Sequence, residues 1–182
     1  EPTLTREGAK RGSNFRCVIR QAWCRMNASG PTIRELSEQQ AKRQPLAVFA
    51  VYTQDDRRIS YDELERGCRA LAALLSSHGA RPGDTVSVVM PNGLQTLRVL
   101  LGAMYSGLCV NPVNLLSQPE QMHYVLAHSD CRVVCVAPEW EQRVRGMLTD
   151  VCRRVEVIVI YPDADTLPLP ANALSGVLPH TR

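Results

Sequence analysis

The residues able to do covalent chemistry are few and are not arranged together. The four histidines are His78, His123, His128 and His180, and nothing in the sequence marks an acidic or nucleophilic partner for any of them. A general base needs a partner that holds its ring in the correct orientation. We therefore expect no catalytic residue among the histidines or elsewhere in this chain.

The seven cysteines form no metal-binding or disulfide pattern. The closest pair, Cys131 and Cys135, lies in an apolar run typical of a strand, where four residues span about 13 Å. That separation is too large for one metal ion or one disulfide bond. The odd number and the apolar settings favour reduced thiols and a cytoplasmic protein, and no metal site is predicted.

Carboxylates and phosphate-binding loops are the remaining candidates. Asp163 and Asp165 could form a carboxylate pair, but they lie in a proline-rich segment that favours a solvated loop. Neither a G-x-G-x-x-G loop nor a G-x-x-x-x-G-K-[ST] loop is present, and the only lysines are Lys10 and Lys42. The sequence thus excludes a P-loop and predicts no cofactor-binding residue.

The composition is that of a soluble globular chain with room for one domain. Of 182 residues, 45% are hydrophobic and 21% are charged. The net charge of +3, from 21 basic and 18 acidic residues, is too balanced for a dedicated nucleic-acid binder. No apolar run approaches the roughly 20 residues of a membrane-spanning helix. We expect neither a nucleic-acid partner nor a membrane span, and residues 1–29 are predicted to form a basic, mobile arm.

Three helix starts are predicted from capping boxes, in which a hydroxyl residue is followed three positions later by glutamate. The second helix has one apolar face and is expected to end at Gly79 in a left-handed conformation. The boxes are Thr32 to Glu35, Ser60 to Glu63 and Ser117 to Glu120, and the face comprises Leu64, Cys68, Leu71, Ala72 and Leu75.

Downstream of that helix, apolar strand-like runs alternate with helical segments. We expect strands at 85–90, 108–113, 131–137 and 155–161, separated by helices at 94–105, 118–128 and 139–152. Such repeats imply right-handed crossovers and a mostly parallel α/β sheet with helices on both faces. We expect this subdomain to occupy residues 30–160, with a proline-rich exit segment at 161–182 and an earlier strand at 46–52 that pairs elsewhere.

Several motifs in the same order resemble the AMP-forming adenylate-ligase superfamily, which includes acyl-CoA synthetases, luciferases and peptide-synthetase adenylation domains. The resemblance spans about residues 32–160. It implies structural roles for the motif residues, which shape turns, caps and strand exits. They are Ser60, Tyr61 and Glu63 in the first core motif, Gly83, Asp84, Pro91 and Asn92 around the first buried strand, and Gly107, Pro112 and Asn114 in the second core motif.

The resemblance also implies what the chain lacks. The family's Ser/Thr/Gly-rich loop with a lysine, its Tyr-x-Thr-Gly-Asp type motif and its C-terminal lysine have no counterpart here. The chain is therefore expected to be an N-terminal piece that stops before the phosphate loop and is inactive alone. The whole enzyme would use ATP and Mg²⁺ to join a carboxylic acid to coenzyme A through an acyl-adenylate.

Two other interpretations remain open at this stage. A self-contained Rossmann-like nucleotide-binding module would fit the strand–helix alternation, although it would need a Gly-rich first turn. A non-catalytic interaction domain would also fit. The sequence does not determine whether the acid is fatty, aromatic or of another kind. It also leaves open the choice between coenzyme A and a carrier-protein thiol, and the oligomeric state.

Overall fold

The computed structural model describes residues 30–53, 55–149 and 154–168. The described residues from Thr32 onward belong to one compact unit. The predicted mobile arm at 1–29 lies outside the described residues. Within the described residues, no helix is long and apolar enough to cross a membrane.

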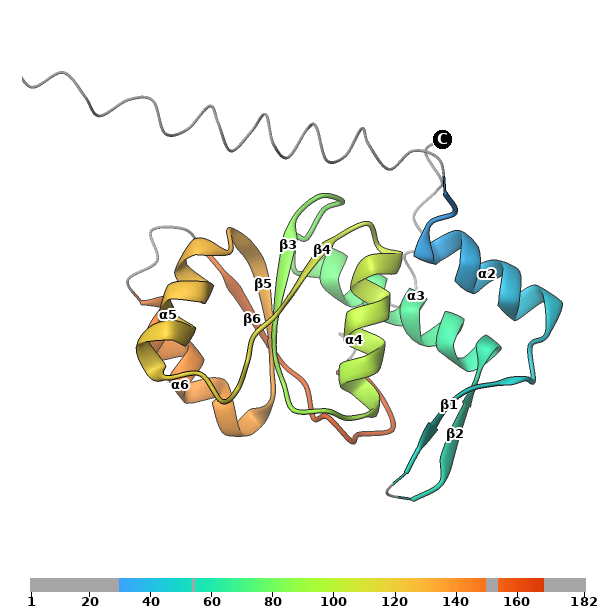
Figure 1. The fold of residues 1–182 in the computed structure, drawn as a ribbon. Coiled ribbons are helices and arrows are strands. Elements are labelled where there is room, and N and C mark those ends of the chain that lie inside the picture. The colour runs from blue at the N-terminus through green and yellow to red at the C-terminus, as the bar shows by residue number, and fades with distance from the viewer. Residues whose placement is uncertain (1–29, 54, 150–153, 169–182) are drawn as a thin grey trace, which may run out of the picture. The chain divides into compact units, whose positions relative to one another are not determined.

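The expected α/β architecture is confirmed (Figure 1). A four-stranded parallel sheet has the order β4-β3-β5-β6, and a two-stranded antiparallel hairpin, β1-β2, lies apart from it. The strands are β1 (Val48–Tyr52), β2 (Arg57–Ser60), β3 (Thr85–Val89), β4 (Cys109–Pro112), β5 (Cys131–Val136) and β6 (Glu156–Val159). The helices are α2 (Ile33–Arg43), α3 (Tyr61–Ser77), α4 (Leu94–Tyr105), α5 (Pro119–His128) and α6 (Pro138–Leu148).

Helices cover both faces of the parallel sheet, as the sequence predicts. One buried cluster joins α3 and α4 to Val86 and Val88 of β3. The other joins α5 and α6 to Val89 of the same strand. Side chains of a strand alternate between faces, so a single apolar strand contributes to both cores. This explains why the central strands are almost continuously hydrophobic.

Two of the three predicted capping boxes are present. Thr32 and Ser60 cap α2 and α3, with Glu35 and Glu63 returning the hydrogen bond to the cap residue. Gly79 follows α3 with a φ of +78°, so the predicted left-handed end of that helix is confirmed.

The third predicted box, Ser117 with Glu120, is wrong. Gln118 is the N-cap of α5, and its backbone N–H donates to the side chain of Gln121 at 3.3 Å. Pro119 explains the shift, because proline favours the first helical position and forces the residue before it into an extended conformation. Gln118 is extended, with a ψ of 153°, so it cannot be the first helical residue as the Ser117 box requires.

The hairpin contains a strand that the sequence did not reveal. The expected strand at 46–52 is present as β1 and pairs with β2 through a turn in which Asp56 has a φ of +56°. β2 carries two arginines and only one buried side chain, Ile59. A four-residue strand with that composition has too little apolar alternation to be recognised.

Candidate functional site

The carboxyl ends of β3 and β4 form a groove of about 420 Å³. Ligands of open α/β sheets bind at this edge because the loops that follow the strands diverge there. Four of the motif residues singled out by the sequence come together in its lining: Pro91, Asn92, Pro112 and Asn114. The structure thus brings two separate motifs, about 20 residues apart in the chain, to one surface.

None of the described residues that line the groove carries a charge. The remaining lining is mostly apolar and includes Leu115 and the exposed Leu116. The hydroxyl of Thr96 donates to the carbonyl of Pro91 at 2.6 Å, and the Asn114 carboxamide accepts from the backbone N–H of Leu116 at 2.9 Å. Such a surface can bind an uncharged group, but it offers no nucleophile, general base or metal ligand.

The other motif residues lie away from this groove. Gly83 and Gly107 sit at the opposite, amino-terminal ends of β3 and β4, where the N–H of Gly83 donates to the carbonyl of Gly107 at 2.8 Å. Both have positive φ, +90° and +73°, which favours glycine. The Asp84 carboxylate accepts from the N–H of Arg81 at 2.9 Å and closes the same turn.

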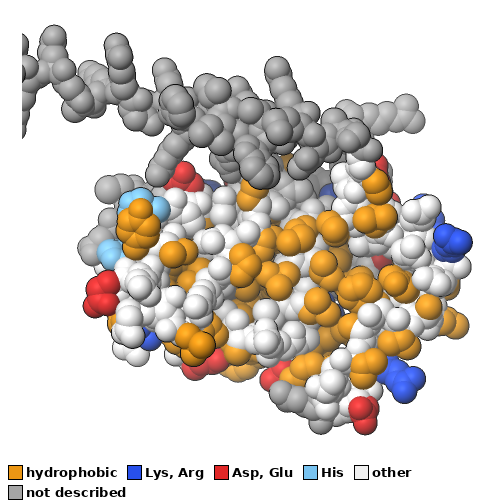
Figure 2. Space-filling view, viewed as in Figure 1, with side chains coloured by type: hydrophobic (Ala, Val, Ile, Leu, Met, Phe, Trp, Pro, Cys, Tyr) orange, Lys and Arg blue, Asp and Glu red, His pale blue; other side chains and the backbone are white. Residues whose placement is uncertain are grey.

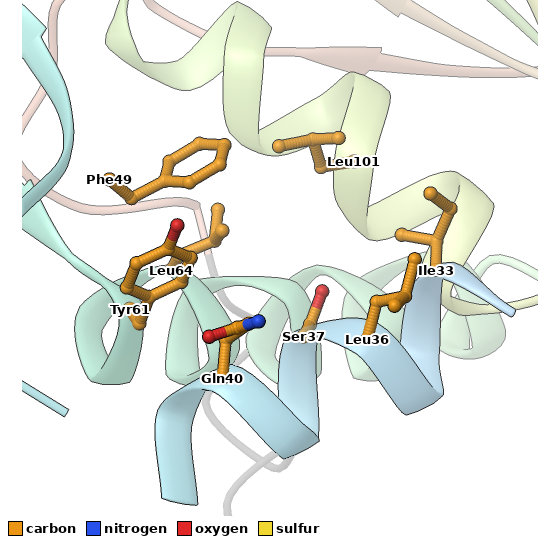
Figure 3. Close-up of a pocket in the computed structure, with 8 residues that line it drawn as sticks. All are labelled: Ile33, Leu36, Ser37, Gln40, Phe49, Tyr61, Leu64 and Leu101. Atoms are coloured by element: carbon orange, nitrogen blue, oxygen red, sulfur yellow. The ribbon is translucent and has the colours of Figure 1, made fainter. Parts of the chain in front are cut away.

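The first core motif lies at the start of α3, beside a second, smaller cavity. Ser60 and Glu63 cap the helix, and the ring of Tyr61 meets that of Phe49 edge-on at 5.5 Å between centroids. Figure 3 shows Tyr61 and Phe49 on one side of this cavity, with Ile33 and Leu36 of α2 on another. Its volume is about 180 Å³ and its lining is largely apolar. Figure 2 shows hydrophobic side chains spread over the side of the molecule that carries α2, α4 and the hairpin.

Asp163 and Asp165 lie in an exposed loop, as the sequence favoured, and each contacts the hairpin. The hydroxyl of Tyr52 donates to the carboxylate of Asp163, and Nη1 of Arg57 lies 2.6 Å from a carboxylate oxygen of Asp165. Both partners belong to the hairpin, more than 100 residues earlier in the chain. The two carboxylates are anchors with separate partners, and a catalytic pair is not formed.

The buried thiols are poor nucleophiles. Burial raises the pKa of Cys68 to about 11 and that of Cys135 to about 12. The thiolate is the reactive form of cysteine, so these two residues are protonated and inert near neutral pH. Cys131 and Cys135 are both buried in β5 and both unpaired.

The groove and the adjacent start of α4 do not fit ATP phosphates or a metal ion. Among residues 30–53, 55–149 and 154–168, no group of three histidine, cysteine or carboxylate side chains could hold a metal. The N-terminus of α4, where a phosphate could bind, is already covered, because the N–H of Gln95 donates to the carbonyl of Pro162 at 2.8 Å.

Two of the four histidines have structural settings. His78 caps the end of α3, and His128 stacks on Tyr124 at 4.0 Å between ring centroids.

Comparison with known proteins agrees with this geometry. Residues 37–178 match the family model described as AMP-binding enzyme. Sulfoacetate–CoA ligase from Cupriavidus necator is 40% identical over 142 residues, which make up 78% of this chain and 28% of that ligase. A plipastatin synthase polypeptide from Bacillus subtilis is 29% identical over 139 residues, 76% of this chain and 4% of that protein.

The solved structures show the same fold. A Mycobacterium tuberculosis fatty acyl CoA synthetase superposes with a TM-score of 0.65 at 20% identity, over 71% of this chain and 26% of that one. The N-terminal domain of FACL13 from the same organism gives a TM-score of 0.65 at 20% identity, over 71% of this chain and 34% of that one. The chain thus spans only a minor part of its relatives, and it belongs to the AMP-binding enzyme family, whose N-terminal region it covers.

Proposed function

We propose that this chain is the N-terminal part of an ATP-dependent, AMP-forming carboxylic acid–CoA ligase. The observation that carries the proposal is the 40% identity to sulfoacetate–CoA ligase over 78% of the chain. The identity to the plipastatin synthase is lower, at 29%. A carboxylic acid is the substrate class, and sulfoacetate is the first acid to test.

The proposed reaction has two steps. A carboxylate oxygen attacks the α-phosphorus of ATP and displaces pyrophosphate, which leaves an acyl-adenylate. A thiol sulfur then attacks the acyl carbon and displaces AMP, which leaves a thioester. Ligases of this family use ATP and Mg²⁺ in general, and these charged species need cationic and metal-binding partners.

No charged residue lines the groove, and the described residues form no metal-binding cluster, so we assign this chain a supporting role. Its groove at the ends of β3 and β4 presents neutral carboxamides and leucines and would contact an uncharged part of a bound molecule. The phosphate and metal chemistry falls to other segments of the enzyme. The isolated 182-residue chain is accordingly expected to be inactive.

A chimeric ligase tests the proposal. Residues 37–178 of this chain would replace the matching segment of the Cupriavidus ligase, and thioester formation would be followed by mass spectrometry with sulfoacetate, ATP and Mg²⁺. We expect a coenzyme A thioester from the chimera and none from the isolated chain. A folded chimera that forms no thioester, while the parent ligase does, would contradict the proposal.

An adenylation domain of a peptide synthetase is the second candidate, supported by the similarity to plipastatin synthase. A second chimera separates the two, in which residues 37–178 replace the matching segment of the plipastatin synthase polypeptide, because such a domain transfers its acyl group to a carrier-protein thiol. An active Cupriavidus chimera beside an inactive synthase chimera would favour the coenzyme A ligase. The reverse result would favour the second candidate.

A further inference from the structure

Residues 161–167 form an ordered segment that we call the strap. It leaves β6 at the carboxyl edge of the sheet and runs along that edge towards the start of α4 and the hairpin (Figure 1). Its last residue, Leu167, is buried in the core that α3 and α4 share. The strap is therefore fixed at both ends, although two prolines and two aspartates stand in or beside it.

Helix α4 holds the inner side of the strap through three backbone carbonyls. The N–H of Gln95 donates to Pro162 at 2.8 Å. The side-chain amide of Gln95 donates to the carbonyl of Ala164, and Nη1 of Arg98 donates to the carbonyl of Asp165 at 3.1 Å. Each of these bonds depends on one turn of α4, so the strap and the helix form one structural unit.

The hairpin holds the outer side through the two carboxylates. Tyr52, the last residue of β1, donates its hydroxyl to Asp163. Arg57, the first residue of β2, bridges Asp165 at 2.6 Å and Asp55 at 2.7 Å. The strap is thus gripped between two elements that precede it by about 70 and about 110 residues in the chain.

The close approach of the strap to α4 requires glycine at position 93. A Cβ on Gly93 would lie 2.7 Å from the carbonyl oxygen of Pro162 and 2.9 Å from the carboxylate of Asp163. The φ of Gly93 is 179°, which any residue can adopt. Space, and not backbone conformation, is therefore what excludes a side chain here.

The buried side chain of Gln95 is the strongest evidence that the position of the strap matters for function. It is completely buried, and its Oε1 has no hydrogen-bond partner in the described part of the chain. A buried unpaired acceptor is costly, and leucine would fill nearly the same volume without that cost. The one hydrogen bond that the Gln95 side chain makes to the described residues is the bond to the carbonyl of Ala164 in the strap.

We propose that the strap is a positioning segment for the ligase reaction and that Gln95, Tyr52 and Arg57 are positioning residues acting through it. The proposal rests on the proposed function. The strap fixes the path by which the chain leaves the sheet. The match to the family model continues past the strap, to residue 178. Segments downstream would therefore be placed against the carboxyl edge by this grip.

The first test asks whether the strap is held, and it uses the full 182-residue chain. Hydrogen exchange of peptides covering 161–167 would be compared between the wild type, Gln95→Leu and the double variant Tyr52→Phe with Asp165→Asn. Loss of either grip should raise strap exchange about tenfold, because local opening sets amide exchange. Glu141→Gln is the matched control, since it breaks an exposed ion pair of α6 with Arg145 at 2.9 Å. Unchanged strap exchange in both variants would overturn the proposal.

The second test measures the consequence in the chimeric ligase. Misplacement of reacting groups by about 1 Å can cost about a hundredfold in rate, so both variants should lower kcat for pyrophosphate release about ten- to a hundredfold. KM for the acid should stay within about twofold, because neither variant alters the groove. Loss of a hydrogen bond costs about 1 kcal/mol, so the melting temperature should fall by no more than about 2–4 °C. Full activity with a released strap would refute the positioning role. If the unmodified chimera makes no thioester, the proposed function fails, whereas the exchange result still reports on the grip alone.

Discussion

Alanine at Gly102 tests the packing of α3 against α4, on which the grip of the strap depends. A Cβ there would lie 2.7 Å from Cδ2 and 3.0 Å from Cβ of Leu71, which is completely buried. Overpacking of this kind costs about 1–3 kcal/mol. Replacing glycine by alanine inside a helix gains about 0.5–1 kcal/mol. We therefore expect Gly102→Ala to lower the free energy of unfolding by up to about 2.5 kcal/mol.

The cost of Gly102→Ala should fall when Leu71 is shortened. Leu71→Ala alone should cost about 2–5 kcal/mol, because it leaves a cavity in a buried cluster. In that background the 2.7 Å contact with Cδ2 is gone while the 3.0 Å contact with Cβ stays, so Gly102→Ala should cost less than it does in the wild type. The coupling energy between the two substitutions should be about 1–2 kcal/mol.

Urea unfolding followed by far-ultraviolet circular dichroism measures all four corners of this cycle. Gly146→Ala is the matched control, because Gly146 lies in α6 and no described atom comes within 4 Å of the position that a Cβ would occupy. It should stabilise by up to about 1 kcal/mol. Equal stabilisation by Gly102→Ala and Gly146→Ala in the wild-type background would refute the close packing of α3 on α4.

Four further predictions concern the strap, the helix caps and the cysteines. Gly93→Ala should lower the free energy of unfolding by about 1–3 kcal/mol through contact with Pro162, and an unchanged urea midpoint would show that the strap does not lie against α4. Ser60→Ala should cost about 1 kcal/mol while Ser117→Ala costs about none, and equal losses in melting temperature would contradict Gln118 as the cap of α5. The hydrogen bond from the Ser60 N–H holds the pKa of the Glu63 carboxyl below its ordinary 4.5. The stability that this bond contributes is therefore present above pH 4.5 and is lost as the pH falls through the pKa of Glu63 in the folded protein. In Glu63→Gln, the free energy of unfolding should depend less on pH in that range. Iodoacetamide at mildly alkaline pH should label the exposed Cys109 in the folded protein, but Cys68 and Cys135 only after unfolding. Peptide mass spectrometry would show the order in which the cysteines are labelled. Labelling of Cys135 in the folded protein would contradict its burial.

The elements with strong local signals were predictable from the sequence. The capping boxes at Thr32 and Ser60 are local hydrogen-bond patterns, and the strand at 85–90 is an apolar run, so neither depends on distant residues. The alternation of strands and helices then implied the parallel sheet. Here the physics that determines the structure acts within a few residues.

The candidate site was predictable only in part, because it depends on distant contacts. Pro91 and Asn114 were singled out by motif, but their common groove requires the strand order β4-β3-β5-β6. The anchoring of Asp163 and Asp165 depends on Tyr52 and Arg57, more than 100 residues away, and no local pattern encodes it. The cytoplasmic location inferred from the cysteines stays a prediction.

ATP–pyrophosphate exchange is the measurement that tests the central claim most directly. It would be run with sulfoacetate and a panel of fatty and aromatic acids, on the isolated chain and on the chimeric ligase side by side. We predict acid-dependent exchange by the chimera and none by the isolated chain, whose described residues hold no metal-binding cluster. Robust exchange by the isolated 182 residues would contradict the assignment of the phosphate chemistry to other segments.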